Sequence, residues 1–116
     1  MNPQDTITIA PSVLITIASH AATQIEGVAR MGSIPVDVGR LLRGHPMGSG
    51  VVLAINDDNS VAVDVYLVAK AGINMREVGR EVQHSITRSI QDLVGMQVTS
   101  VTVHFEDVEY STPDRQ

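Results

Sequence analysis

The sequence contains no cysteine and no tryptophan, and Tyr66, Phe105 and Tyr110 are its only aromatic residues. A chain without cysteine has no disulfide framework, no thiolate chemistry and no cysteine-based zinc site. Because aromatic side chains are so few, the core has to be aliphatic. Hydrophobic residues make up 43% of the 116 positions, which suffices for the core of one compact domain. We therefore expect residues 1–116 to form a single domain.

Basic residues are scarce as well. Lysine and arginine number 8 against 13 acidic residues, so the formal net charge is −5. Nucleic acid binding requires a basic surface that neutralises phosphates, and adhesion to an anionic membrane has the same requirement. The composition therefore argues against a nucleic acid partner and against direct attachment to a membrane.

Residues 6–25 carry no charge, over a length that could span a membrane. Hydroxyl and amide side chains are spread through the stretch, Pro11 interrupts it and no basic residue precedes it. We interpret it as a short strand at 6–9 followed by a buried helix, with Ser12 as the predicted N-cap and Gly27 as the end. One face of this helix is apolar: Leu14, Ile17, Ala18, Ala21, Ile25 and Val28.

Residues 72–103 give the clearest pattern in the chain. Asn74 is placed to cap a helix, and Glu77 is placed to bond back to it, as in a capping box. Gly95 tolerates the left-handed conformation that commonly ends a helix. The apolar positions between them are Met75, Val78, Val82, Ile86, Ile90 and Leu93, and the polar positions are Arg76, Glu77, Arg80, Glu81, His84, Arg88 and Asp92. Gly79 falls on the apolar side, where it either admits a sheet closely or is a mildly destabilising surface glycine.

The remaining segments complete an α+β pattern. Residues 51–55 and 61–69 are predicted to form a hairpin with a turn at 56–59, and 98–105 form a last strand. The glycine-rich residues 29–50 are a predicted loop, with one or two helical turns around 38–43. The order is β-α-loop-β-β-α-β. We predict a two-layer sandwich in which two helices cover one face of a four-stranded, mainly antiparallel sheet, with right-handed β-α-β crossovers.

The four histidines raise the question of a metal site. His20 and His84 fall on the outer faces of the two predicted helices, and His45 falls in the loop. None has a ligand partner four residues along a helix. His104 and Glu106 share a strand face and could ligate together, but zinc requires three or four ligands. We expect solvated histidines and no bound metal.

Two polar segments resemble ligand loops only superficially. A phosphate-binding loop leads from a strand into a helix and ends in lysine followed by serine or threonine, whereas residues 44–50 precede a predicted strand and the next lysine is Lys70. Residues 56–59 are rich in side-chain oxygen, but a calcium loop needs wider spacing and a closing glutamate. We interpret these segments as a flexible connector and a hairpin turn. No Ser-His-Asp spacing stands out, although distant residues can still form a triad in space. We expect no catalytic residue and no cofactor.

The outer side of the first predicted helix is weakly polar, because Glu26 is the only charge between residues 6 and 29. The cores of protein interfaces are depleted in charge. The side chains concerned form a candidate self-association surface: Ile15, Thr16, Ser19 and Thr23. An ordinary solvated face rich in serine and threonine explains the same pattern equally well.

Short motifs follow one another along about residues 6–110. They are Ile7-Thr8-Ile9-Ala10-Pro11, Ile17-Ala18, Ala21-Ala22, Glu26-Gly27-Val28, Gly50-Val51, Gly72-Ile73-Asn74-Met75, Val78, Val82-Gln83, Gly95-Met96, Val98 and Val101-Thr102-Val103. In this order and spacing they resemble the alkaline shock protein family of bacterial envelope stress-response proteins. Ala71 and Thr102 depart from the family, where an aromatic residue and an asparagine are common. Neither change touches a catalytic residue, because the family has no established one.

The resemblance implies a small cytoplasmic protein that acts in envelope homeostasis or alkaline tolerance without catalysing a reaction. It implies a homo-oligomer that reaches the membrane through an anchored protein partner. Some family genes lie beside a fatty-acid kinase, so the alternative is an accessory subunit or small-ligand-binding protein for a lipid-handling enzyme. A hydrolase with a spatially assembled site is a third hypothesis. A flat self-complementary face would favour assembly, and a cleft lined by convergent polar groups would favour the other two.

Overall fold

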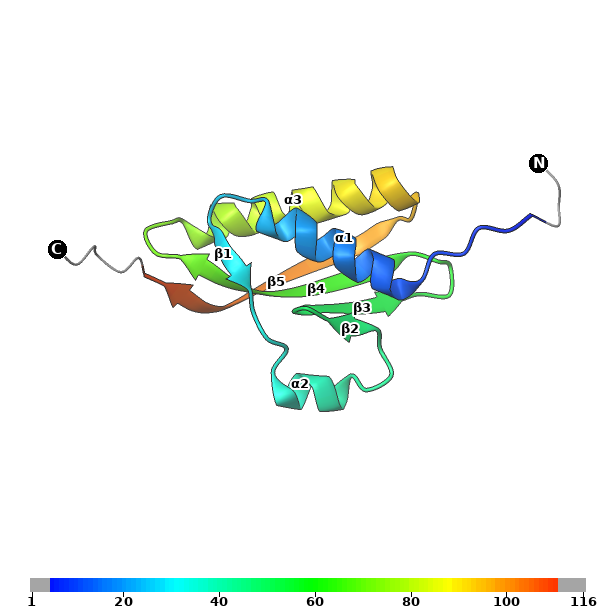
Figure 1. Ribbon diagram of the computed structural model, residues 1–116, viewed down its shortest axis with the longest axis horizontal. Coiled ribbons are helices and arrows are strands. Elements are labelled where there is room, and N and C mark those ends of the chain that lie inside the picture. Colours follow the sequence, from blue (N-terminus) through cyan, green and yellow to red (C-terminus); the bar gives the residue numbers. More distant parts are fainter. Residues whose placement is uncertain (1–4, 111–116) are drawn as a thin grey trace.

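The computed structural model describes residues 5–110, which form three helices and an open five-stranded sheet (Figure 1). In chain order the elements are α1 (Pro11–Thr23), β1 (Val28–Met31), α2 (Val36–Leu41), β2 (Met47–Gly48), β3 (Val51–Ile55), β4 (Val61–Lys70), α3 (Met75–Val94) and β5 (Val98–Glu109). Helices α1 and α3 lie side by side over one face of the sheet, and α2 stands apart beyond β2 (Figure 1). The predicted α+β two-layer architecture is confirmed.

Strand β4 runs through the middle of the sheet and pairs on both of its edges. β5 lies parallel to it over its whole length. The opposite edge is shared by two antiparallel strands, with β3 beside the first half of β4 and β1 beside the second half. β2 pairs with β3 on the outside. The predicted β3–β4 hairpin and the β4–α3–β5 crossover are both present, and the sheet has five strands instead of the expected four.

β1 and β3 follow one another along the same edge of β4, as one strand interrupted by residues 33–49. The junction is at Tyr66, whose carbonyl accepts from the Gly32 N–H and whose N–H donates to the Gly50 carbonyl. Gly50 has φ +76°, and a Cβ there would lie 2.8 Å from the Gly32 oxygen. Only glycine fits this close approach. The sequence prediction of a loop over 29–50 was therefore wrong at both ends, where β1 and β2 form.

The core lies between the two helices and the inner face of the sheet, and it is aliphatic as predicted. Small side chains let α1 approach closely, since Ala18 and Ala22 are fully buried. The buried residues of the core are Leu14, Ala18, Ala21, Ala22, Val28, Val51, Leu53, Val61, Val63, Val65, Leu67, Val78, Val82, Ile86 and Ile90. No aromatic residue of the described chain belongs to this cluster, and Phe105 is partly buried against its margin.

The predicted strand at residues 6–9 does not form. The segment runs up to α1 unpaired, and Ile7 is 86% exposed. The alternation of apolar and polar residues favours an extended chain, but a strand also needs a neighbouring strand with which to pair. Ser12 is not the N-cap either, because Pro11 occupies the first helical position and Ala10 precedes it without a side-chain cap. Proline suits that position, since its φ is already helical and it has no N–H to satisfy. The helix ends at Thr23, and Val28 belongs to β1. Within residues 5–110, no helix combines the length and apolar character needed to cross a bilayer.

Helix α3 begins and ends where its local signals predict. The Asn74 side chain accepts from the Glu77 N–H at 3.1 Å, and Gly95 closes the helix in the left-handed conformation. The Glu77 carboxylate does not bond back to the Asn74 N–H, so only half of the expected reciprocal cap is present.

The buried face of α3 follows residues four apart, from Val78 through Val82 and Ile86 to Ile90. The prediction that Leu93 faces the sheet was wrong, because it is 71% exposed and Val94 packs against the core in its place. Met75, at the other end of the predicted apolar face, is also exposed. At Gly79 an added Cβ would lie 3.6 Å from the Phe105 ring, which is ordinary contact. A close approach of the sheet therefore does not require this glycine.

Exchange of Ile86 for alanine should lower the free energy of unfolding by about 2–5 kcal/mol, because the side chain is fully buried and a cavity would remain. Leu93→Ala is the matched control on the same helix and should change it by no more than about 0.5 kcal/mol. Urea unfolding of both variants tests this pair. Equal losses would mean that the helix buries a different face.

Asn74→Ala should cost about 1 kcal/mol of unfolding free energy, since the first turn of α3 loses its side-chain acceptor. Asn74→Ser should retain most of the stability, because a serine oxygen can accept the same N–H. Thermal unfolding of the two variants would measure the difference. If both variants are equally destabilised, the stabilising effect of Asn74 does not come from its side-chain cap.

Candidate functional site

The outer side of α1 borders a shallow open hollow of about 590 Å³. Three of the four candidate self-association residues line it, and its full lining is Thr16, Ser19, His20, Thr23, Met31, Gly32 and Ser49. The fourth, Ile15, is half-buried and packs against the core. The structure thus brings the three hydroxyl residues together on one surface and turns Ile15 away from it.

The hydroxyl groups on this surface are already satisfied within α1. Thr16 Oγ1 donates to the Ser12 carbonyl at 3.1 Å, and Ser19 Oγ donates to the Thr16 carbonyl at 3.2 Å. Thr23 Oγ1 lies 3.0 Å from the Ser19 carbonyl and 3.1 Å from that of His20. A buried hydroxyl is costly only when it lacks a partner. Another protein could therefore cover this side of α1 without leaving these donors unpaired.

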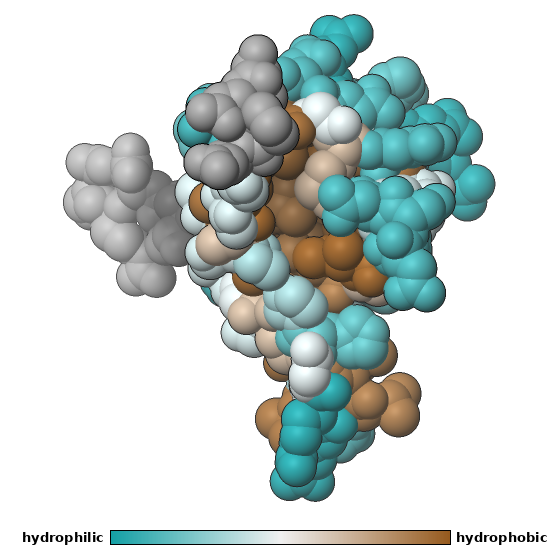
Figure 2. All heavy atoms as spheres, turned by 90° about the vertical axis from the view of Figure 1, so that its right-hand side faces the viewer, coloured by the Kyte–Doolittle hydropathy of each residue, from teal (hydrophilic) through white to brown (hydrophobic). Residues whose placement is uncertain are grey.

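A second hollow, of about 260 Å³ and lined mostly by aliphatic residues, opens at the end of the sandwich where α1 begins and α3 ends. Figure 2 views that end and shows hydrophobic residues gathered beside a polar margin. Its lining is Ile7, Ile9, Leu14, Ile55, Asn59, Val94, Gly95 and Met96. The residues of the unformed strand at 6–9 contribute to this hollow, together with the end of the core.

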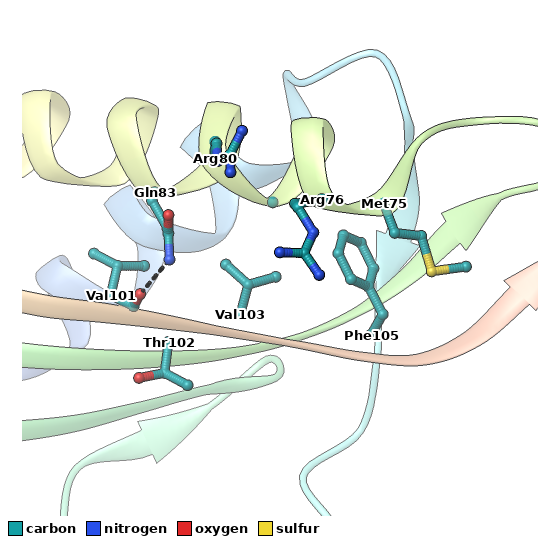
Figure 3. A pocket seen from close by; sticks show the side chains of 9 residues that line it. Met75, Arg76, Arg80, Gln83, Val101, Thr102, Val103 and Phe105 are labelled. Carbon is teal, nitrogen blue, oxygen red and sulfur yellow. Dashed lines mark hydrogen bonds between the residues drawn. The ribbon is translucent and has the colours of Figure 1, made fainter.

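A groove of about 610 Å³ runs between α3 and β5 (Figure 3). Arg76, Arg80 and Gln83 come from the helix, and Val101, Val103 and Phe105 come from the strand. Gln83 Nε2 donates to the Val101 carbonyl at 3.0 Å, which closes one point of the groove. The sequence signal for this groove was the polar side of α3, but that signal did not indicate which residues face β5.

Polar residues gather on the face of the sheet opposite the helices. His104 Nε2 lies 2.8 Å from an Asp64 carboxylate oxygen, and its ring stacks on Tyr66 with centroids 4.3 Å apart. Glu106 reaches another part of this face and accepts from the Ser33 N–H. The predicted pair of His104 and Glu106 thus makes separate contacts. Within residues 5–110, no three histidine or acidic side chains converge as a metal site would require. The other histidines are exposed on separate elements: His20, His45 and His84.

The two polar segments take up ordinary connecting roles. Residues 44–50 contain β2 and the tight turn that connects it to β3. They belong to the connection between β1 and β3. Residues 56–59 form the hairpin turn, where an Asp58 oxygen accepts from both the N–H and the hydroxyl of Ser60. These hydrogen bonds lower the pKa of Asp58, the hydroxyl bond most of all.

Tyr66 gives the polar face a predictable response to alkaline pH. Burial raises the pKa of its phenol above 10.0, and the nearby Asp64 and Glu106 carboxylates raise it further. The fold thus favours the neutral phenol. This contribution to stability is fully present below the unfolded-state pKa and is lost as pH rises through the higher folded-state pKa.

The free energy of unfolding should therefore fall above about pH 10, and Tyr66→Phe should reduce that fall. Urea unfolding at a series of alkaline pH values measures it. Tyr110→Phe, at an exposed tyrosine, is the control and should keep the wild-type profile. A Tyr66→Phe profile as steep as that of the wild type would show that another group controls the alkaline response.

Comparison with known proteins identifies relatives along the whole chain. A sequence model of the alkaline shock protein 23 family, described as having a "cell envelope-related function", matches residues 1–110. "Uncharacterized protein YqhY" of Bacillus subtilis (strain 168) is 28% identical over 117 residues, covering 97% of this chain and 86% of that protein. "Uncharacterized protein Spy1535" of Streptococcus pyogenes serotype M6 is also 28% identical, covering 88% of this chain and 78% of that protein. These matches confirm the predicted family resemblance.

Solved structures support the fold alone. Two structures named MamM-CTD superpose on the chain with TM-scores of 0.51 and 0.50, each at 9% sequence identity. The first covers 89% of this chain and all of the other, so the similarity extends over the α+β sandwich as a whole.

Proposed function

The chain belongs to the alkaline shock protein 23 family, which has a cell envelope-related function, and from this premise we propose that it acts by assembly and not by catalysis. Copies of the protein would associate with one another in the cytoplasm, and an anchored protein partner would hold the assembly at the membrane. The observation that supports assembly most directly is the outer side of α1, where uncharged side chains line an open hollow.

Three properties of this surface suit a contact between copies. It has no Asp, Glu, Lys or Arg side chain that would have to be desolvated, and burying an unpaired charge is expensive. Its hydroxyls keep their partners when water is removed. It also presents carbon atoms, since the threonine methyl groups remain free once the oxygens turn to the helix, and Val13 is 43% exposed on the same helix. Removal of apolar area from water drives association.

The geometry of assembly depends on what the α1 surface meets. If it meets the same surface of a second copy, the product is a closed two-fold dimer. If it meets a different surface, the contact repeats head to tail and gives a filament. The hollow beside α1 is open and is lined also by Met31 and Gly32 at the end of β1. A different surface of a second copy could therefore fit into it. We favour the repeating contact.

The non-catalytic part of the proposal rests on where the polar groups lie. The His104–Asp64 pair is on an open sheet face, with both side chains more than a third exposed. Within residues 5–110, Asp64 is the one hydrogen-bond partner of the His104 ring, so no nucleophile is oriented by it. Among the described residues, the other histidines lie on other parts of the chain, so no further histidine joins this pair.

The alternative is an accessory or small-ligand-binding protein for a lipid-handling enzyme. The hollow at the end of the sandwich favours it, because most of its lining residues are aliphatic and a short apolar chain could contact them. Its volume of about 260 Å³ is below the range of about 300–1,000 Å³ usual for ligand pockets. The hollow therefore supports this function less strongly than the α1 surface supports assembly.

Ser19→Arg should weaken assembly while leaving the monomer folded. The new charge would lie in the contact, but it projects into an open hollow in the free protein. Analytical ultracentrifugation over a range of concentrations should show a smaller average mass for the variant, and circular dichroism should show an unchanged fold.

Gln91→Arg provides the matched control, since it adds the same charge at an exposed position of α3. This control should assemble as the wild type does. A wild type that stays monomeric at high concentration would refute self-assembly. Weakening by Gln91→Arg and not by Ser19→Arg would place the contact along α3 and away from α1.

A further inference from the structure

Strand β5 leaves one edge of the sheet unpaired. It is the longest strand, with 12 residues, and β4 is its one partner within residues 5–110. An unpaired edge offers backbone N–H and C=O groups to any extended chain that approaches, so proteins commonly protect it with proline, a covering loop or a short strand. β5 contains no proline and is not short. Gln83 occupies a single carbonyl, that of Val101.

Helix α3 places two arginines beside this open edge. Arg76 and Arg80 line the groove above Val103 and Phe105 (Figure 3). Neither arginine forms an ion pair with an acidic side chain of residues 5–110, where the ion pairs are Arg30–Glu109 and His104–Asp64. The groove therefore combines an apolar floor, free backbone groups and two cations without a partner in the described structure.

The stability of α3 does not account for these arginines. Like charges four residues apart on a helix repel one another and destabilise it by a few tenths of a kcal/mol. Cations in the first turns of a helix also oppose its dipole, and Arg76 is the second residue of α3. Glu77 and Glu81 lie on a different side of the helix, around the separate hollow near Glu26 and Lys70. The cations are thus segregated toward β5.

We propose that the edge of β5 and the α3 arginines bind an extended acidic segment of a protein partner, which adds to the sheet as a further strand. Backbone hydrogen bonds to β5 would hold the segment, as in other cases of strand addition. Every second side chain would face α3. Carboxylates at alternate positions of a strand lie about 6.5–7 Å apart, which matches the separation of about 6 Å between helix residues four apart. The motif recognised is an acidic residue, any residue, and a second acidic residue.

A second copy of the chain suits this groove poorly. Pairing of β5 with β5 of another copy would bring two further arginines toward Arg76 and Arg80. The acidic residues of β5 that could offset them are engaged elsewhere: Glu106 contacts Ser33, Asp107 accepts from the Val108 N–H, and Glu109 contacts Arg30. The groove also lies at the opposite edge of the sheet from β1 and β3, which α1 covers. It is therefore separate from the proposed assembly surface, and its occupation does not depend on assembly.

A labelled synthetic peptide of about ten residues, in which glutamate alternates with threonine, tests the proposal by fluorescence anisotropy. The peptide should bind the wild-type protein, and binding should weaken as salt is raised. Arg80→Gln should weaken it by about tenfold, and Arg76→Gln should act in the same direction. Arg88→Gln is the matched control, since it removes the same charge from α3 outside the groove, and it should bind as the wild type does.

Backbone methylation separates strand addition from simple ionic attraction. Methyl groups on alternate peptide nitrogens should abolish binding in one of the two registers and leave it intact in the other, because only one register faces β5. The proposal is overturned if the glutamate peptide does not bind, if Arg88→Gln weakens binding as much as Arg80→Gln, or if both methylated peptides bind equally. It is also overturned if a Thr102→Cys variant cross-links to a second copy at this residue, which would assign the edge to the chain itself.

Discussion

Every other part of the structure depends on the burial of strand β4. Val61, Val63, Val65 and Leu67 are fully buried under the two helices, and both edges of the strand are paired. A strand buried in this way must find partners for all its backbone groups, because an unpaired buried amide is expensive. β5 satisfies one edge throughout. The other edge needs β1 and β3 together, since neither is long enough alone. The helices then complete an aliphatic layer that requires no large aromatic side chain.

Local signals sufficed for the parts of the fold whose partners are close in sequence. The β3–β4 hairpin follows from two apolar runs around a polar turn, and α3 follows from Asn74, Gly95 and the spacing between them. β1 and β2 were missed because both are short, because β1 pairs with a distant segment, and because β2 pairs through only two residues. Residues 6–9 show the converse error, since they alternate like a strand but have no edge to join. Leu93 was misplaced because residues three and four apart are both plausible neighbours on a helix.

For each candidate surface, the sequence showed part of what matters and only the structure showed the rest. The lack of charge on α1 was visible in the sequence, but the internal bonding of Thr16, Ser19 and Thr23 was not, since it depends on side-chain conformation. The arginines of α3 were visible as a polar face. Their position beside an unpaired edge depends on β5 being the last strand of the sheet, which only the topology reveals. An envelope-related protein with two such surfaces could link copies of itself on one side and bind a partner on the other.

The interruption between β1 and β3 makes the architecture modular. Both ends of residues 33–49 are fixed at neighbouring points on β4, where Gly32 and Gly50 meet at Tyr66. Between these ends, residues 34–45 lie outside the sheet, and each doubling of their length would cost only about 0.6 kcal/mol of chain entropy while β2 keeps its pairing with β3. Helix α2 projects from the body on this tether (Figure 1). A fluorescent or affinity module placed within it could report on the protein in living cells while the sandwich and both of its open surfaces stay intact.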